Sequence, residues 1–320
     1  MFADAATPSL PWVLLLAGLV TVGAIPLGVH LGFRAPRLGI NGSPAALGLD
    51  YAAVRIPTVR GRTLSGWLLP APGARRSVIL LHGWGSNAEL MLPLALPLHR
   101  AGCNLLLFNA RNHGSSDGDT FSSLPRFAED LGQAITWLRA QHPEATAHIS
   151  VLGHSVGAGA ALLEATRNPQ VRAVIAIGTF ADPDELTERS LARLHLPRLV
   201  VNLTKRYVQW IIGHRFADIA PINTICRVAC PVLLVHGSHD RTVPITDARR
   251  IAAAANGAPV RLYEVPDADH DSVHLVEAHA EVLVRFLDET HRASCGGSDN
   301  GAGPDSRPEQ PRTDAQPWVA

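Results

Sequence analysis

The stretch Gly153-His154-Ser155-Val156-Gly157 decides the predicted fold, because it joins two segments of different character. The apolar run 148–152 before it is typical of a buried strand, and the small apolar segment 158–163 after it favours a helix. A strand, a sharp turn and a helix in this order push the serine out at the carboxyl end of the strand. The motif therefore predicts that Ser155 is a nucleophile. The alternative is a structural turn, because short patterns of this kind also arise by chance.

The composition excludes some classes of protein. The 28 basic and 28 acidic side chains cancel, and no run rich in Lys or Arg occurs, so the charge pattern of a nucleic-acid binder is missing. The 4 cysteines lack C-x-x-C spacing and do not cluster with histidines, which argues against a zinc site and a disulfide framework. We therefore expect no nucleic-acid partner and no metal, and we expect free thiols.

An uncharged, mostly aliphatic run covers residues 11–33, behind a short N-terminal segment 1–10. As a helix this run is about 35 Å long, enough to cross a bilayer core, so the sequence predicts a transmembrane helix. A cleaved signal peptide and a helix packed on the domain are the alternatives; the first lacks a preceding positive charge, and the second rarely needs so long an uncharged stretch. Arg34 and Arg37 follow the run, so the positive-inside rule predicts a single-pass membrane protein whose following domain is cytoplasmic.

After a linker, 34–48, apolar runs alternate with amphipathic segments over residues 49–291. This alternation predicts an α/β domain with a mostly parallel sheet. The first two predicted strands form an antiparallel pair, and all eight cover residues 54–56, 64–69, 77–81, 104–108, 148–152, 171–177, 232–235 and 260–265. Helices are predicted over 127–141, 156–167, 246–255 and 272–290, with a helical cap inserted over 182–216. The polar segment 292–320 is predicted to be a disordered tail.

A serine hydroxyl becomes a nucleophile when a base takes its proton and an acid orients that base. Two loops that follow predicted strands supply both groups: Asp240 lies in the loop after 232–235, and His270 lies in the loop after 260–265. The carboxyl ends of parallel strands meet at one sheet edge, where open α/β folds bind ligands. We therefore predict that Ser155, His270 and Asp240 form a catalytic triad.

Other residues compete for the two supporting roles. His274 and His279 are rivals of His270, but both fall within the predicted last helix. The rivals of Asp240 are further acids in loops of the same region: Asp267, Asp269, Asp182 and Asp184.

An oxyanion hole requires two backbone N–H donors. The residue after the serine, Val156, supplies one. The loop after the strand 77–81 reads Leu81-His82-Gly83-Trp84-Gly85, and its glycines allow the backbone to approach a substrate. The second predicted donor is the N–H of Trp84.

These motifs, together with the segment 108–118 (F-N-A-R-N-H-G-S-S-D-G), resemble the α/β-hydrolase superfamily over roughly residues 51–290. Within it the chain is similar to serine-aminopeptidase-like and lysophospholipase-like hydrolases. The resemblance implies an eight-stranded, mostly parallel sheet, hydrolysis of an ester, thioester or amide through an acyl-enzyme, and no cofactor. Val156 and Asn109 depart from the residues common at their positions, and we expect effects on pocket shape and loop packing only. His82, His113, Arg111 and Asp117 are interpreted as structural.

The substrate is not identified by these motifs. We expect a small-molecule ester, thioester or amide, or a lipid, with a carboxylesterase or lysophospholipase-like esterase as the first choice. The apolar cap 182–216 would serve either as an acyl pocket or as packing for the core. The alternatives are a peptidase or thioesterase on the same triad, and a catalytically silent binding protein on the same fold.

Overall fold

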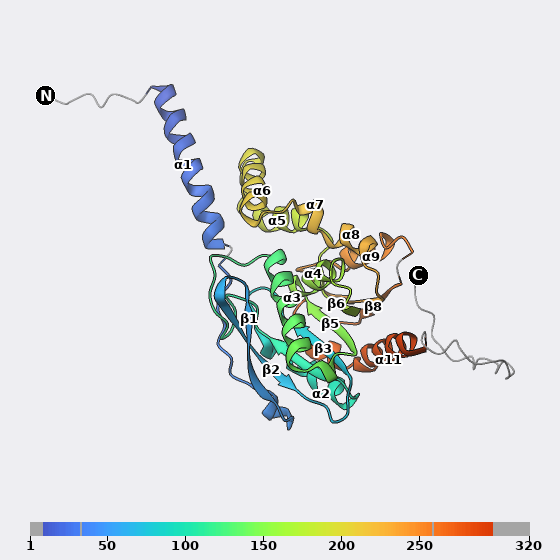
Figure 1. Ribbon diagram of the computed structural model, residues 1–320. Helices are drawn as coiled ribbons and strands as arrows, with labels where there is room; N and C mark the ends of the chain where they lie inside the picture. Colours follow the sequence, from blue (N-terminus) through green and yellow to red (C-terminus); the bar gives the residue numbers. More distant parts are fainter. Residues whose placement is uncertain (1–8, 33, 258, 297–320) are drawn as a thin grey trace.

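The computed structural model describes residues 9–32, 34–257 and 259–296. Its strands form a single sheet at the centre of the molecule (Figure 1). They are β1 (Ala52–Thr58), β2 (Arg62–Leu69), β3 (Arg76–Leu81), β4 (Asn104–Phe108), β5 (His148–His154), β6 (Val171–Ile177), β7 (Val232–Gly237) and β8 (Val260–Val265).

The sheet is eight-stranded, in the order β1-β2-β4-β3-β5-β6-β7-β8. β1 and β2 pair antiparallel, β2 joins β4 antiparallel, and the remaining neighbours are parallel. The inner strands β4 and β5 are buried along their whole length, because helices cover both faces of a parallel sheet. The predicted eight-stranded, mostly parallel sheet is confirmed.

Helices cover both faces of the sheet. The helices of the described chain are α1 (Leu10–Gly32), α2 (Leu92–Arg100), α3 (Leu124–Gln141), α4 (Val156–Ala165), α5 (Pro183–Ala192), α6 (Arg198–Ile212), α7 (Phe216–Ile219), α8 (Pro221–Thr224), α9 (Ile245–Ala253), α10 (Val273–Glu277) and α11 (Ala280–Gly296). Figure 1 shows α1 directed away from the sheet. Successive residues of β3 point to opposite faces: Ile79 and Leu81 pack in the cluster that holds α3 and α4, whereas Val78 and Leu80 pack in the cluster that holds α2 and α11. Each face therefore has its own hydrophobic core.

The structure differs from the predicted elements in three places. Helix α2 was not expected, because Pro93 and Pro97 interrupt its pattern; Pro93 lies in the first turn, where proline is tolerated. The helix predicted over 272–290 is divided into α10 and α11. Helix α11 continues to Gly296, so the tail predicted from residue 292 begins as helix, and residues 297–320 lie outside the described residues. The described cysteines Cys103, Cys226 and Cys230 are free thiols, as expected.

Helix α1 forms over nearly the whole run that was predicted to cross a membrane. Within the described part of the chain, however, no helix meets the combined length and apolarity of a membrane span, so the transmembrane helix predicted over 11–33 is not supported. The end of α1 packs on the cap helix α6, where Tyr207 Oη and His30 Nε2 are 3.2 Å apart. This contact is the one expected from the packed-helix alternative. The orientation predicted from Arg34 and Arg37 stays a prediction.

Candidate active site

Ser155 occupies the turn between β5 and α4 with φ 53° and ψ −115°. This backbone conformation is unusual for a residue with a side chain and is stored strain. The neighbouring glycines make the turn possible, because a Cβ at Gly153 would lie 2.3 Å from the carbonyl oxygen of Gly157, and a Cβ at Gly157 would lie 2.4 Å from that of His82. The Ser155 side chain is thereby held at the carboxyl end of the central strand.

The structure brings the three predicted triad residues into contact. The Nε2 of His270 lies 2.9 Å from the Oγ of Ser155, and its Nδ1 lies 2.7 Å from the Oδ2 of Asp240. The Asp240 side chain is 1% exposed and that of His270 is 12% exposed. Since a carboxylate accepts and Nδ1 then donates, Nε2 is left to accept the serine proton.

Asp240 is held as an anion by its surroundings. Burial alone would raise its pKa, but contacts with His236 and His270 and the backbone N–H of Val243 outweigh burial and hold the pKa well below its usual range. The Oδ1 accepts from the N–H groups of Thr242 (2.9 Å) and Val243 (2.7 Å). Because Oδ1 is occupied in this way, Oδ2 is aimed at His270.

The rival histidines lie elsewhere. His279 Nδ1 is 2.9 Å from the hydroxyl of Tyr263, and His274 is part of α10. Among the described residues, the side-chain partners of the His270 ring are Ser155 and Asp240, and neither rival histidine takes part in these bonds.

The rival acids are engaged otherwise. Asp182 caps α5, Asp184 pairs with Lys205 at 2.7 Å, and Asp269 accepts from Ser272. The side chain of Asp267 is 84% exposed, and its described ion pair is with His239. Of the candidate acids in the described chain, Asp240 is the one hydrogen-bonded to His270.

The loop after β3 lies against the Ser155 turn. A Cβ at Gly83 would be 2.9 Å from the Nδ1 of His154 and 3.1 Å from the Cβ of Ser155, so any larger residue would force these neighbours to shift. Gly83, Trp84, Ser155 and Val156 line the same cavity. The loop is thus placed where a second oxyanion donor is needed.

Two buried histidines tie this loop to the loop after β4. The Nε2 of His82 accepts from the N–H of Ala110, and the Nε2 of His113 accepts from the N–H of Gly85, each at 3.1 Å. Burial, then the neighbouring His113, lowers the pKa of His82 to about 3, and burial lowers the pKa of His113. Both rings are therefore neutral acceptors, which confirms their interpretation as structural residues.

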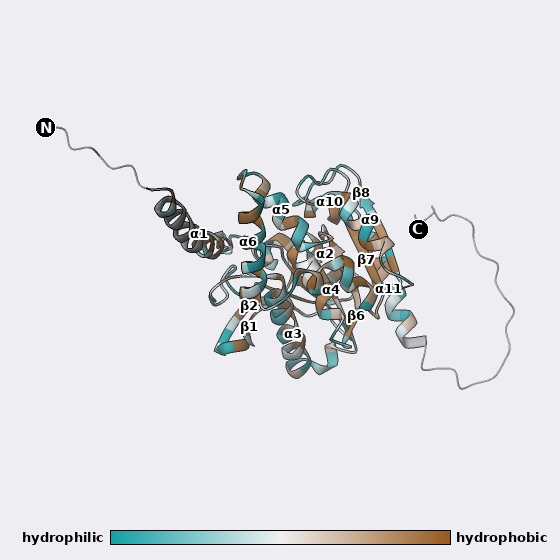
Figure 2. Ribbon diagram, turned by 90° about the horizontal axis from the view of Figure 1, so that it is seen from above, coloured by the Kyte–Doolittle hydropathy of each residue, from teal (hydrophilic) through white to brown (hydrophobic). Residues whose placement is uncertain are grey.

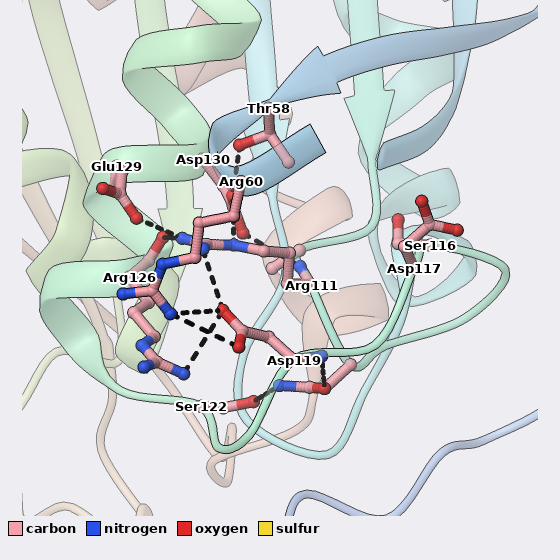
Figure 3. A network of polar contacts seen from close by, with 12 residues as sticks. Thr58, Arg60, Arg111, Ser116, Asp117, Asp119, Ser122, Arg126, Glu129 and Asp130 are labelled. Atoms are coloured by element: carbon pink, nitrogen blue, oxygen red, sulfur yellow. Dashed lines mark hydrogen bonds and ion pairs between the residues drawn. The ribbon is translucent and has the colours of Figure 1, made fainter. Parts of the chain in front are cut away.

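Arg111 is the centre of the buried polar network in Figure 3. It is 2% exposed; its Nε donates to Asp130 (2.8 Å), its Nη1 donates to Asp119 (3.1 Å), and it also pairs with Glu129. Asp130 in turn accepts from the hydroxyl of Thr58 at 2.9 Å. The network anchors the loop between β4 and α3, so the structural interpretation of Arg111 is confirmed.

Two further loop residues have the packing roles expected of them. Asp117 accepts from the N–H of Thr63 at 2.8 Å. Asn109 accepts from the N–H of Ala88 at 2.8 Å and donates to Ser65.

His154 is the site residue that the sequence analysis missed. It is 1% exposed, lines the cavity beside Ser155 and contacts the backbone of His270. Burial, then the neighbouring His270, lowers its pKa to about 4. Its one sequence signal is its position directly before the serine.

One group in the described chain has the spacing of a metal site. The ligand atoms of His154, His270 and Asp271 lie within 4.8 Å of one another. A cation bound there would compete with Ser155 for the imidazole of His270.

The chain is similar to known hydrolases. The family model described as Serine aminopeptidase, S33 matches residues 72–224. An uncharacterized protein of Mycobacterium tuberculosis (strain ATCC 25618 / H37Rv) is 29% identical over 241 residues, which are 74% of this chain and 79% of that protein. The thiohydrolase apmlB of Arthrinium phaeospermum is 30% identical over 127 residues, which are 39% of this chain and 41% of the thiohydrolase.

A solved structure extends the likeness to the fold. The Pyrococcus furiosus esterase Pf2001 superposes with a TM-score of 0.65 at 26% identity, covering 81% of this chain and 96% of the esterase. With the sheet order, these likenesses show that the chain has the α/β-hydrolase fold, and they support a hydrolase.

Proposed function

We propose that the chain is a serine hydrolase that cleaves carboxylic esters through an acyl-enzyme. The observation that supports this function is the chain of contacts from Ser155 Oγ through His270 to Asp240 (2.9 and 2.7 Å), placed at the wall of a cavity of about 810 Å³. The match of residues 72–224 favours the serine-aminopeptidase-like group within the superfamily.

In the acylation half, Ser155 Oγ attacks the ester carbonyl carbon while His270 Nε2 takes the hydroxyl proton. The carbonyl oxygen becomes an oxyanion, which the backbone N–H groups of Trp84 and Val156 stabilise; one such donor contributes about 3 kcal/mol. The bond from the carbonyl carbon to the leaving oxygen then breaks, and His270 returns the proton to the alcohol.

In the deacylation half, water attacks the acyl-Ser155 ester and gives its proton to His270. The bond to Oγ breaks, the proton returns to Ser155, and a carboxylic acid leaves. Asp240 stays ionised throughout and stabilises the imidazolium of His270, consistent with its lowered pKa.

Labelling and turnover test this function together. The wild-type chain is expected to react with a fluorophosphonate and to hydrolyse p-nitrophenyl butyrate, and Ser155→Ala is expected to lose both while keeping its circular-dichroism spectrum. The matched control is Ser190→Ala, which removes a second cavity-lining hydroxyl on α5. Labelling that persists in Ser155→Ala would remove Ser155 from the role. A wild-type chain with neither labelling nor turnover would instead favour a binding protein on this fold.

Thioester hydrolysis is a second candidate, favoured by the likeness to the thiohydrolase apmlB. The same triad would transfer the acyl group, with a thiol as the leaving group. Rates for an oxygen ester and a thioester of the same acyl group separate the two candidates.

A further inference from the structure

A large apolar cavity extends from the triad into the space between the cap and α1. Its volume is about 810 Å³, within the range of small-molecule sites. Among its described lining residues the titratable groups are His154, His270 and Asp271, all at the triad end. The remaining walls are mainly aliphatic and aromatic, so the cavity offers no described cation to pair with an anionic group deep inside it.

One wall of this cavity comes from α1, which lies outside the segment matched by the family model. Val29 is 6% exposed and packs in the main core cluster, and Ile25 packs against the same cluster. The His30 and Tyr207 rings, 6.2 Å apart, join α1 to α6, and Figure 2 shows the end of α1 beside that helix. The end of α1 is therefore part of the wall around the candidate site.

Three of the five residues of α1 that line the cavity are small, and the other two are Ile25 and Val29. Ala24, Gly28 and Gly32 recur at every fourth position, which places them on one side of the helix, and all three line the cavity. A Cβ built at Gly28 or Gly32 meets no atom within 4 Å. Gly28 and Gly32 are exposed, so a larger side chain at either position enters open space beside the cavity without displacing the core.

We infer that α1 is the acyl-binding wall and that its Gly28 position sets the length of the acyl chain accepted. The inference rests on the proposed function: the substrate is an ester whose carbonyl reaches Ser155 and whose long, uncharged acyl chain lies along α1 and α6. Each buried methylene group raises kcat/KM by about fourfold until the cavity is filled.

The test compares Gly28→Phe with Gly23→Phe in the full chain. Both variants replace a glycine in the same helix, and in each the new side chain has a higher helix propensity than glycine. Gly23 and Gly28 are both exposed, and neither has an atom within 4 Å of a built Cβ, but only Gly28 lines the cavity. The readout is the ratio of kcat/KM for p-nitrophenyl octanoate to that for the acetate.

The wild-type chain and Gly23→Phe are expected to prefer octanoate by a factor of about 100 or more, and Gly28→Phe is expected to lower the ratio at least about tenfold. If Gly28→Phe does not fold, Gly28→Leu gives the same comparison with a smaller side chain. A wild-type ratio near unity, or an unchanged ratio in the folded Gly28 variant, overturns the inference while the hydrolase function stands. Loss of all ester turnover and of labelling in the wild-type chain would overturn the proposed function itself.

Discussion

The Nε2–H of His154 donates to the backbone carbonyl of His270 across 2.7 Å, and the two rings lie 5.1 Å apart. A carbonyl oxygen accepts, so this bond fixes the proton of His154 on Nε2. The Nδ1 of His154 has no hydrogen-bond partner within the described structure. His154 therefore ties the His270 loop to the turn that carries Ser155.

Replacing His154 by Phe is expected to slow acylation by about tenfold to a hundredfold. The change removes one hydrogen bond and leaves a buried carbonyl unpaired, which costs about 1–3 kcal/mol. His154→Gln keeps an N–H donor and should recover part of the rate. The measurement is the rate of fluorophosphonate labelling of folded protein, with kcat and KM for p-nitrophenyl butyrate.

A positioning role predicts that kcat changes more than KM, because the base is misplaced while the cavity remains. Equal labelling rates in the wild-type chain and in His154→Phe would show that the bond to His270 serves stability alone.

Replacing Asp240 by Asn is expected to lower kcat by about 10⁴-fold, the loss seen when a triad carboxylate becomes an amide that favours the wrong imidazole tautomer. Asp267→Asn is the matched control, since its side chain is 84% exposed. Steady-state turnover with an unchanged circular-dichroism spectrum is the readout. If the Asn variants at 240 and 267 were equally active, another group would have to orient His270.

The stability of the fold is expected to fall as the pH is lowered from about 6.5 toward 4. Burial first, then neighbouring histidines, lowers the pKa of His82 to about 3 and the pKa values of His148 and His154 to about 4. In this window the unfolded chain binds protons that the folded chain does not, which costs about 1.4 kcal/mol per pH unit for each histidine. Burial raises the pKa of Asp130 to about 6. Below that pH the folded chain binds a proton at Asp130 that the unfolded chain does not, and this gain offsets the loss of stability from one of the three histidines.

His82→Gln isolates one of these contributions. The free energy of unfolding of this variant, measured in urea, should fall by about 2 kcal/mol less than that of the wild-type chain between about pH 7 and pH 5. Parallel pH curves for the two proteins would mean that His82 takes up a proton in the folded state.

The strands and the three site loops were predictable because their signals are local. Parallel strands such as β5 are buried on both faces and read as continuous apolar runs, and each loop that carries Ser155, Asp240 or His270 follows such a run directly. The sequence order of those loops together with the parallel topology was enough to place them at one edge of the sheet.

The wall formed by α1 was not predictable for a physical reason. A run that is apolar on every side has no periodic pattern, so nothing in it distinguishes Gly28 and Val29 from their neighbours. The same run suits a bilayer, a signal peptide or a protein cavity. The role of His154 was hidden too, because its partner is a backbone carbonyl 116 residues away.

Replacing Arg111 by Met is expected to destabilise the fold by about 3–5 kcal/mol, because Asp130 would stay buried without its guanidinium partner. Asp119 keeps its pairs with Arg60 and Arg126. Arg55→Met is the control: this side chain is 61% exposed, lies 3.8 Å from Asp117, and its loss should cost less than about 1 kcal/mol. In urea unfolding, the double variant Arg111→Met with Asp130→Asn should be less destabilised than the sum of the two single changes, since one change removes the charge that the other leaves unpaired.

The same variant connects the network to the site. Arg111 is flanked by Ala110, whose N–H bonds His82, and its own carbonyl oxygen is 2.9 Å from the Nδ1 of His113. Loosening this loop should therefore loosen the loop that carries Trp84, and fluorophosphonate labelling of folded Arg111→Met should be slower than that of Arg55→Met. The two variants each remove one arginine, which is buried at position 111 and exposed at position 55. Equal stability and equal labelling rates for the two variants would refute the role of the network in anchoring the loop.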